Sequence, residues 1–144
     1  MKLLVFGKTG QVATELARLA PDAHFVGRDA ADLSVAGACA ALIEQVKPDL
    51  IINAAAYTAV DKAEEEEALA TAINGAAPTE MALAAHALGV PLVHISTDYV
   101  FEGGGTDPWT PNAPTGPLGL MGAANWLVRT ACAPHKAHMP SCAP

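Results

Sequence analysis

The stretch KLLVFGKTGQVA, residues 2–13, decides the fold. Its first half is a short apolar run that ends at Gly7, as expected for a buried β-strand. From Gln11 the apolar residues recur at helical spacing until Pro21 stops the pattern. Gly7 permits a tight turn, and Gly10 lets backbone N–H groups approach a phosphate at the start of the helix. This strand, turn and helix therefore predict a dinucleotide-binding turn.

An ordinary turn between a strand and a helix is the alternative interpretation, because two glycines alone are a weak signal. Ala13 supplies a third small residue, which allows close packing of the helix on the strand. The strand before the turn and the helix after it favour the binding interpretation.

The rest of the chain alternates short apolar runs with helical patterns. Further strands are expected at residues 25–26, 50–53 and 91–95, and helical stretches at residues 35–46, 61–73 and 77–88. This alternation predicts parallel strands joined by right-handed crossovers, with helices on both faces of the sheet. The expected fold class is α/β: a truncated, Rossmann-like doubly wound sheet of about four parallel strands in the order 3-2-1-4. A Gly- and Pro-rich segment at residues 101–117 predicts a long loop.

Composition limits the function classes. With 144 residues, 51% hydrophobic and 16% charged, the chain is expected to form one folded domain. A net charge of −7 argues against nucleic-acid and membrane partners, and no apolar run is long enough to cross a bilayer. Three cysteines, an odd number, do not suggest a disulfide framework. We expect a soluble, cytoplasmic protein.

Arg28 follows the second expected strand, where the adenosine ribose of a dinucleotide is bound. An arginine there can pair with a 2′-phosphate, whereas an acidic residue would bind the free hydroxyl groups. Asp29 comes next, so NADPH and NADH both remain open as the cofactor. A solvated pair of turn residues is the alternative.

Small and hydroxylated residues follow the third and fourth expected strands. Ala54, Ala55 and Ala56 leave room for a cofactor, although a closely packed sheet also uses alanines. Ser96 and Thr97 are expected to leave the fourth strand beside the first, at the topological switch point where ligands bind. A hydroxyl there can bond a substrate carbonyl, or it can simply accept from turn N–H groups.

Three segments together resemble the dTDP-4-dehydrorhamnose reductase family, which is similar to extended short-chain dehydrogenases. They are LVFGKTGQV (residues 4–12), INAAAYTAVDKAE (residues 52–64) and STDYVF (residues 96–101). The resemblance is collinear and covers residues 1–120. It implies that NADPH or NADH reduces the C4 ketone of a dTDP-linked 4-keto-6-deoxy sugar, giving dTDP-L-rhamnose.

The same resemblance assigns roles to individual residues. Thr97 would be the catalytic hydroxyl and would also contact substrate, and Asp98 would lie near the sugar nucleotide. No metal is expected. The cofactor would be held by Gly10, Gln11 and Val12 at the pyrophosphate, by Asp32 and Leu33 at the adenine, and by Ala54, Ala55 and Ala56 at the inner part. From the motifs described above, Gly7, Arg28 and Ser96 are also expected among the cofactor-binding residues.

The chain departs from the family after Leu120. The family uses a tyrosine to protonate the ketone oxygen and a lysine, four positions later, to lower the tyrosine pKa from about 10. Met121 and Asn125 stand in those places and can do neither. The sugar-binding half is also absent, so we expect an inactive polypeptide. Its fourth strand would be an apolar edge through which the chain could self-associate.

We hypothesise a change of reading frame. If Leu120 is encoded CTT, reading one base earlier from Met121 onward allows Tyr-Gly-x-x-Lys-Leu-Ala-Gly, which is the tyrosine–lysine helix that the resemblance requires. A single-base loss near the Leu120 codon would leave residues 1–120 as an incomplete NAD(P)-binding domain and residues 121–144 as an out-of-frame tail. Four residues of the tail have a spacing that could suggest a zinc site, but such spacing matches are often false: Cys132, His135, His138 and Cys142.

Three interpretations stay open at this point. The first is the cofactor-binding portion of a reductase that is inactive as this chain. The second is a non-catalytic nucleotide-binding or regulatory module of the same family. The third is a remnant that does not fold stably.

Overall fold

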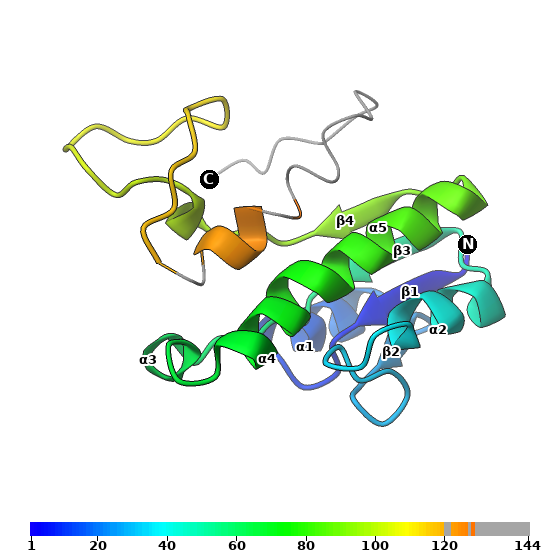
Figure 1. The fold of residues 1–144 in the computed structure, drawn as a ribbon. Helices are drawn as coiled ribbons and strands as arrows, with labels where there is room; N and C mark the ends of the chain where they lie inside the picture. Colours follow the sequence, from blue (N-terminus) through cyan, green and yellow to red (C-terminus); the bar gives the residue numbers. More distant parts are fainter. Residues whose placement is uncertain (120–121, 127, 129–144) are drawn as a thin grey trace.

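Four parallel strands form one sheet in the computed structural model, which describes residues 1–119, 122–126 and 128 (Figure 1). The strands are β1 (Leu3–Phe6), β2 (His24–Val26), β3 (Leu50–Asn53) and β4 (Leu92–His94). The helices are α1 (Gln11–Leu19), α2 (Ala38–Val46), α3 (Val60–Ala63), α4 (Glu67–Thr71), a π-helix (Ala72–Ala76), α5 (Ala77–Leu88) and a 3-10 turn (Asp98–Val100). The α/β class and the parallel, doubly wound sheet are confirmed. The zinc spacing in the tail, together with Leu120 and Met121, lies outside the described residues.

The predicted strand order 3-2-1-4 is wrong, because the observed order is β2-β1-β3-β4. Both orders occur in doubly wound sheets, and both satisfy right-handed crossovers. The packing of α2 decides between them. Its buried residues join Leu4 and Phe6 in one cluster, whereas Ala13 of α1 is buried outside that cluster, on the other face of β1. A right-handed crossover on the opposite face runs in the opposite direction, so β3 pairs with β1 rather than with β2.

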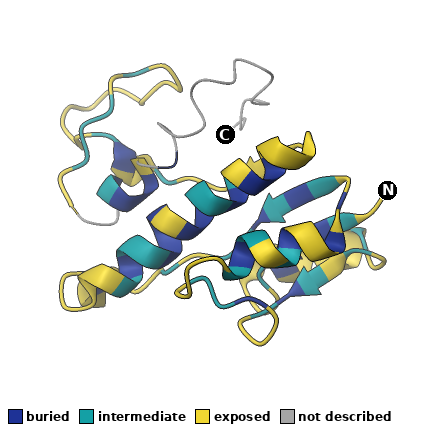
Figure 2. Cartoon of the chain, turned by 45° about the vertical axis from the view of Figure 1, so that its right-hand side comes forward, coloured by how far each residue is buried: buried dark blue, intermediate teal, exposed yellow. Residues whose placement is uncertain are grey.

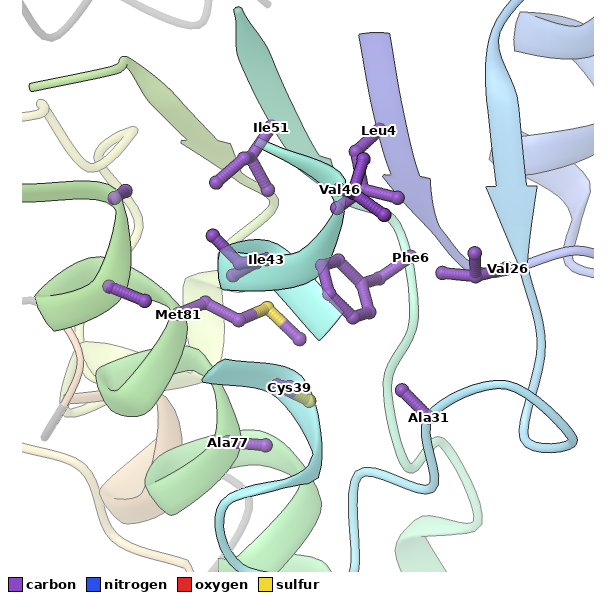
Figure 3. Close-up of a cluster of buried hydrophobic side chains, with 12 residues drawn as sticks. Leu4, Phe6, Val26, Ala31, Cys39, Ile43, Val46, Ile51, Ala77 and Met81 are labelled. Carbon is purple, nitrogen blue, oxygen red and sulfur yellow. The ribbon is translucent and has the colours of Figure 1, made fainter. Parts of the chain in front are cut away.

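The hydrophobic core lies between the sheet and the helices α2 and α5 (Figure 3). Phe6, Ile51, Ile43 and Met81 are fully buried there. Burial of side chains of this size stabilises the fold by roughly 1.5–3 kcal/mol each. Figure 2 shows the result on α5, where one side of the helix is buried and the other is exposed. The described residues therefore build a core on a sheet of four strands.

Helix α2 begins at Ala38, three residues later than the apolar pattern predicts. Gly37 adopts a left-handed conformation (φ 84°), which ends the preceding turn and prevents the helix from starting earlier. The Glu80 carboxylate of α5 accepts hydrogen bonds from Gly37 N (2.9 Å) and Ala40 N (2.7 Å). A carboxylate from another helix thus replaces the local cap that the sequence of α2 lacks.

The loop after the 3-10 turn is largely exposed, as the sequence predicts (Figure 2). The rings of Phe101 and Trp109 stack with centroids 5.1 Å apart, and Trp126 Nε1 donates to Thr115 Oγ1 (3.0 Å). Within the sheet that the structure describes, strand β4 is an edge; its Val93 is 38% exposed, and Ile95, directly after the strand, is 44% exposed. Among the described residues, no helix combines the length and apolar character that a membrane span needs.

Candidate functional site

The turn after β1 has the geometry of a backbone cradle. Gly7 has φ 109°, and a Cβ at this position would meet the backbone C and O of Ala54 at 3.1 Å. Gly10 is the N-cap of α1, with extended backbone and no side chain that could bond the first N–H groups of the helix. These N–H groups carry a partial positive charge and have no partner within the helix. The turn can therefore receive a phosphate.

Two adjoining cavities extend from this turn. The β2 cavity, of about 410 Å³, lies toward the end of β2 and is lined by Lys8, Gly27, Arg28, Asp29, Asp32 and Leu33, among others. The β4 cavity, of about 980 Å³, lies toward the end of β4 and is lined by Gly10, Gln11, Val12, Ser96, Thr97 and Asp98, among others. Both are lined by Gly7, Lys8, Thr9, Ala55 and Ala56. A hollow with two lobes on either side of a glycine turn fits a dinucleotide.

The structure brings every predicted cofactor residue to one of these lobes. Ala54 lines the β4 cavity, and the alanines after it line both. Strand β3 pairs with β1, so the Ala54–Ala56 segment lies directly beside the glycine turn at the switch point of the sheet. Ser96 and Thr97 are one strand further away than predicted, because β3 separates β4 from β1.

Two buried asparagines hold the segment after β3 in place. Asn53 Oδ1 accepts from Ala55 N (3.1 Å). Asn74 Oδ1 accepts from Tyr57 N (2.8 Å), and its Nδ2 donates to Tyr57 O (2.9 Å). Asn74 is 2% exposed and belongs to the π-helix, an element that is frequent at functional sites. The sequence reasoning missed Asn74, although a lone asparagine in an alanine-rich helical stretch was a usable signal.

The Thr97 hydroxyl already has partners. It donates to Asp98 Oδ1 (3.2 Å) and accepts from Tyr99 N (3.3 Å), which starts the 3-10 turn. The Thr97 hydroxyl therefore caps the 3-10 turn, as the alternative interpretation of this residue expects. Thr97 also lines the β4 cavity, so a substrate carbonyl there would compete with Asp98 for its proton.

Two tyrosines and Asn125 also line the β4 cavity. Asn125 is 8% exposed, and residues 122–126 are helical. Its amide brings no positive charge to the position where the resemblance requires a lysine. Tyr57 cannot replace the missing acid, because the hydrogen bond it donates to Glu66 Oε2 (2.6 Å) raises its pKa to about 12. Within residues 1–119, 122–126 and 128, no group of three or more His, Cys, Asp or Glu side chains is arranged to hold a metal.

His94 is a half-buried histidine next to this site, and its Nε2 atom is buried. In the pairing of β3 with β4, His94 lies opposite Asn53, and Asn53 Nδ2 lies 3.1 Å from His94 Nδ1. The Asn53 oxygen already accepts from Ala55 N, so its amide donates and the proton of the neutral ring must sit on Nε2. The buried Nε2 has no hydrogen-bond partner among the described residues. Burial lowers the pKa of His94 from its ordinary value of 6.5.

We expect the fold to lose stability as the pH falls from 7 to 5. Below about pH 6.5 the unfolded chain binds a proton at His94 that the folded chain excludes, so the free energy of unfolding falls, by at most about 1.4 kcal/mol per pH unit. Thermal unfolding followed by circular dichroism over this range measures the slope. His94→Gln should flatten it, whereas His24→Gln, at an exposed position, should not. An unchanged slope in His94→Gln would contradict the assignment.

Comparison with known proteins agrees with this geometry. The sequence model of the RmlD substrate binding domain matches residues 1–139. The chain is 46% identical to dTDP-4-dehydrorhamnose reductase from Burkholderia thailandensis over 136 residues, which cover 92% of the chain and 46% of the relative. It is 41% identical to the Escherichia coli K12 protein of the same name over 146 residues, which cover 94% of the chain and 49% of the relative.

A solved structure carries the same fold. The crystal structure of dTDP-4-dehydrorhamnose reductase from Bacillus anthracis in complex with NADP superposes with a TM-score of 0.83 at 30% identity, covering 91% of this chain and 49% of that one. The chain thus spans about half the length of the curated relatives it matches. By its match over residues 1–139, the chain belongs to the RmlD substrate binding domain family.

Proposed function

We propose that this chain is the nicotinamide-dinucleotide-binding half of a dTDP-4-dehydrorhamnose reductase, and that it binds NADPH or NADH without reducing the dTDP-linked 4-keto-6-deoxy sugar by itself. The observation that carries the proposal is the pair of cavities that meet at Gly7, Lys8 and Thr9. The names of the relatives, and the NADP in the Bacillus anthracis complex, support the same ligand class.

Each predicted site residue has a role in this proposal. The backbone at Gly7 and Gly10, with the first turn of α1 at Gln11 and Val12, receives the pyrophosphate. The β2 cavity, with Arg28, Asp32 and Leu33, takes the adenosine, and the β4 cavity takes the nicotinamide beside Ala54, Ala55, Ala56 and Ser96. When bound, the reduced nicotinamide would supply a hydride. Thr97 would orient the ketone oxygen, and Asp98 would hold the Thr97 hydroxyl and border the sugar nucleotide.

We expect proton donation to the ketone oxygen to be the step that fails, because Met121 and Asn125 stand where the resemblance requires a tyrosine and a lysine. The described residues of the β4 cavity place an amide, Asn125, where the resemblance requires a cation, and the Tyr57 phenol is tied to Glu66. Loss of a general acid commonly lowers a rate by a factor of about 10²–10⁴. Binding without turnover is therefore the expected behaviour.

Fluorescence titration with NADPH and NADH, combined with a sugar-reduction assay, tests the proposal. We expect saturable binding of at least one dinucleotide, and turnover lower by a factor of at least about 10² than that of the full-length Escherichia coli relative. Absence of binding to a folded chain would contradict the proposal, and so would turnover that matches the relative.

A non-catalytic binding or regulatory module is the second candidate. It is favoured by the Thr97 hydroxyl, which already donates a hydrogen bond to Asp98 Oδ1. The two candidates differ when the chain is added to a full-length reductase: a regulatory module should change its turnover, whereas a separated catalytic half should not.

We propose further that the exposed edge at β4 supports self-association, since an apolar edge strand readily pairs with another chain. Analytical ultracentrifugation should show mass increasing with concentration, and Val93→Lys should reduce the association. A monomer at all concentrations would contradict this.

Residues 1–120 form, in this proposal, the incomplete NAD(P)-binding domain, and residues 121–144 an out-of-frame tail. The family match extends to residue 139, which is inside the proposed tail. Sequencing of the coding DNA therefore has to test the change of reading frame. A coding sequence without a Tyr-Gly-x-x-Lys-Leu-Ala-Gly run in the alternative frame would refute the tail assignment.

We place the protein in the cytoplasm, which suits the free thiol of Cys39.

A further inference from the structure

We propose that the β2 cavity selects a dinucleotide with a phosphate on the 2′ position of its adenosine ribose, and that Lys8 and Arg28 together make this selection. The inference rests on the proposed function, because it assigns the adenosine to this cavity. It resolves the choice between NADPH and NADH that Arg28 and Asp29 leave open in the sequence.

Two cations from separate segments line the same cavity. Lys8 belongs to the turn after β1, and Arg28 follows β2. The stem of Lys8 crosses toward β2: its Cβ and Cδ each lie 3.6 Å from where a Cβ would stand on Gly27. The missing side chain of Gly27 therefore leaves room for the lysine. In the described part of the chain, Lys8 makes no ion pair that would hold its charge elsewhere.

One of the two carboxylates in the cavity that could bind free ribose hydroxyls is already engaged. Asp32 Oδ1 accepts from Ser34 Oγ (2.7 Å) and from Ser34 N (2.9 Å). These hydrogen bonds, with the nearby Arg28, lower the pKa of Asp32, so the carboxylate stays charged and directed at its own turn. Recognition of a ribose without a 2′-phosphate depends on an available carboxylate after the second strand. Asp32 is not available for that role.

Arg28 can move to a phosphate at low cost. Its Nε lies 3.8 Å from Asp32 Oδ2, and its side chain is 78% exposed. An exposed pair at this separation contributes little, whereas a guanidinium can bind a phosphate through two parallel hydrogen bonds. Asp29 is the remaining carboxylate in the cavity, and its Oδ1 would lie 2.8 Å from a Cβ on Gly27. The cavity thus offers a dianionic phosphate two cations, Lys8 and Arg28, and Asp29 is the remaining carboxylate that would repel it.

Fluorescence titration of the full 144-residue chain with NADPH and with NADH tests the inference. The variants are Lys8→Met, which keeps an apolar stem, Arg28→Gln, and the double variant. The control is Arg18→Gln, which removes a cation of α1 that pairs with Glu15 (3.1 Å) and does not line the cavity. All of these side chains are exposed, and circular dichroism verifies that each variant folds.

We expect the Kd for NADPH to be about tenfold lower than that for NADH. Each single variant should raise the Kd for NADPH about three- to tenfold and leave that for NADH within about twofold. The double variant should bind both equally, and Arg18→Gln should match the parent chain.

Equal Kd values in the parent chain, or tighter binding of NADH, would overturn the inference and leave the proposed function intact. Variants that weaken both dinucleotides equally would also overturn it, since the cations would then act on the pyrophosphate. If neither dinucleotide binds, the proposed function fails and the inference fails with it.

Discussion

Gly7→Ala should abolish measurable dinucleotide binding and destabilise the fold by about 2–3 kcal/mol. The backbone at Gly7 has φ 109°, which residues with a Cβ rarely adopt. The added methyl would also meet Ala54 C and O at 3.1 Å and Ala55 N at 3.3 Å, and these are backbone atoms of the neighbouring strand end. Relief of the contact has to move either the glycine turn or the Ala54–Ala56 segment, and both line the two cavities.

Thermal unfolding and NADPH titration measure the two effects. Gly89→Ala is the matched control, since Gly89 also has a positive φ of 68° and no described atom lies within 4 Å of an added Cβ. It is the C-cap of α5 and lines neither cavity, so we expect a cost of about 1 kcal/mol and unchanged binding. Parent-like binding by Gly7→Ala would show that the turn does not receive the ligand.

Asn74→Ala should destabilise the fold by about 2–4 kcal/mol, because it removes both hydrogen-bond partners of the Tyr57 backbone. A partly buried N–H and a partly buried carbonyl would lose their bonds together. The segment Ala54–Tyr57 would then lose its attachment to the π-helix, and we expect the Kd for NADPH to rise at least about tenfold. Chemical denaturation and fluorescence titration give the two numbers.

Asn74→Asp separates positioning from general stability. Its carboxylate can still accept from Tyr57 N but cannot donate to Tyr57 O, so we expect an intermediate loss of affinity. Thr79→Ala is the control: it removes a hydrogen bond from Thr79 Oγ1 to Gly75 O (2.8 Å) in the same helical region but leaves Tyr57 untouched. A folded Asn74→Ala chain with parent-like affinity would show that Asn74 is structural only.

The parts of the fold that depend on neighbouring residues could be predicted from the sequence. The strand at Leu3–Phe6, the turn at Gly7 and the helix from Gln11 follow from apolar spacing and from two glycines. Strand ends were predicted to within one or two residues, and all predicted cofactor residues line the two cavities. The reason is that a parallel sheet brings the carboxyl ends of its strands to one edge, whichever strand order it has.

The features that depend on distant contacts could not be predicted. Asn74 bonds Tyr57 across 17 positions, and Glu80 caps α2 across 43. A helical pattern shows which residues face a core but not which backbone groups they will meet. The position of Thr97 was predicted one strand too close to β1 for the same reason.

By itself the sequence determined an α/β chain with parallel strands and a glycine turn at the first strand end, because periodicity and turn chemistry are local properties. Only the tertiary structure decided that β3 joins β1, since that depends on the face of the sheet against which α2 packs. The same packing sets Ala54 against Gly7 and carries Lys8 to the end of β2. The proposed ligand type thus follows from the local motif, whereas the shape and charge of the candidate site follow from how the faces pack.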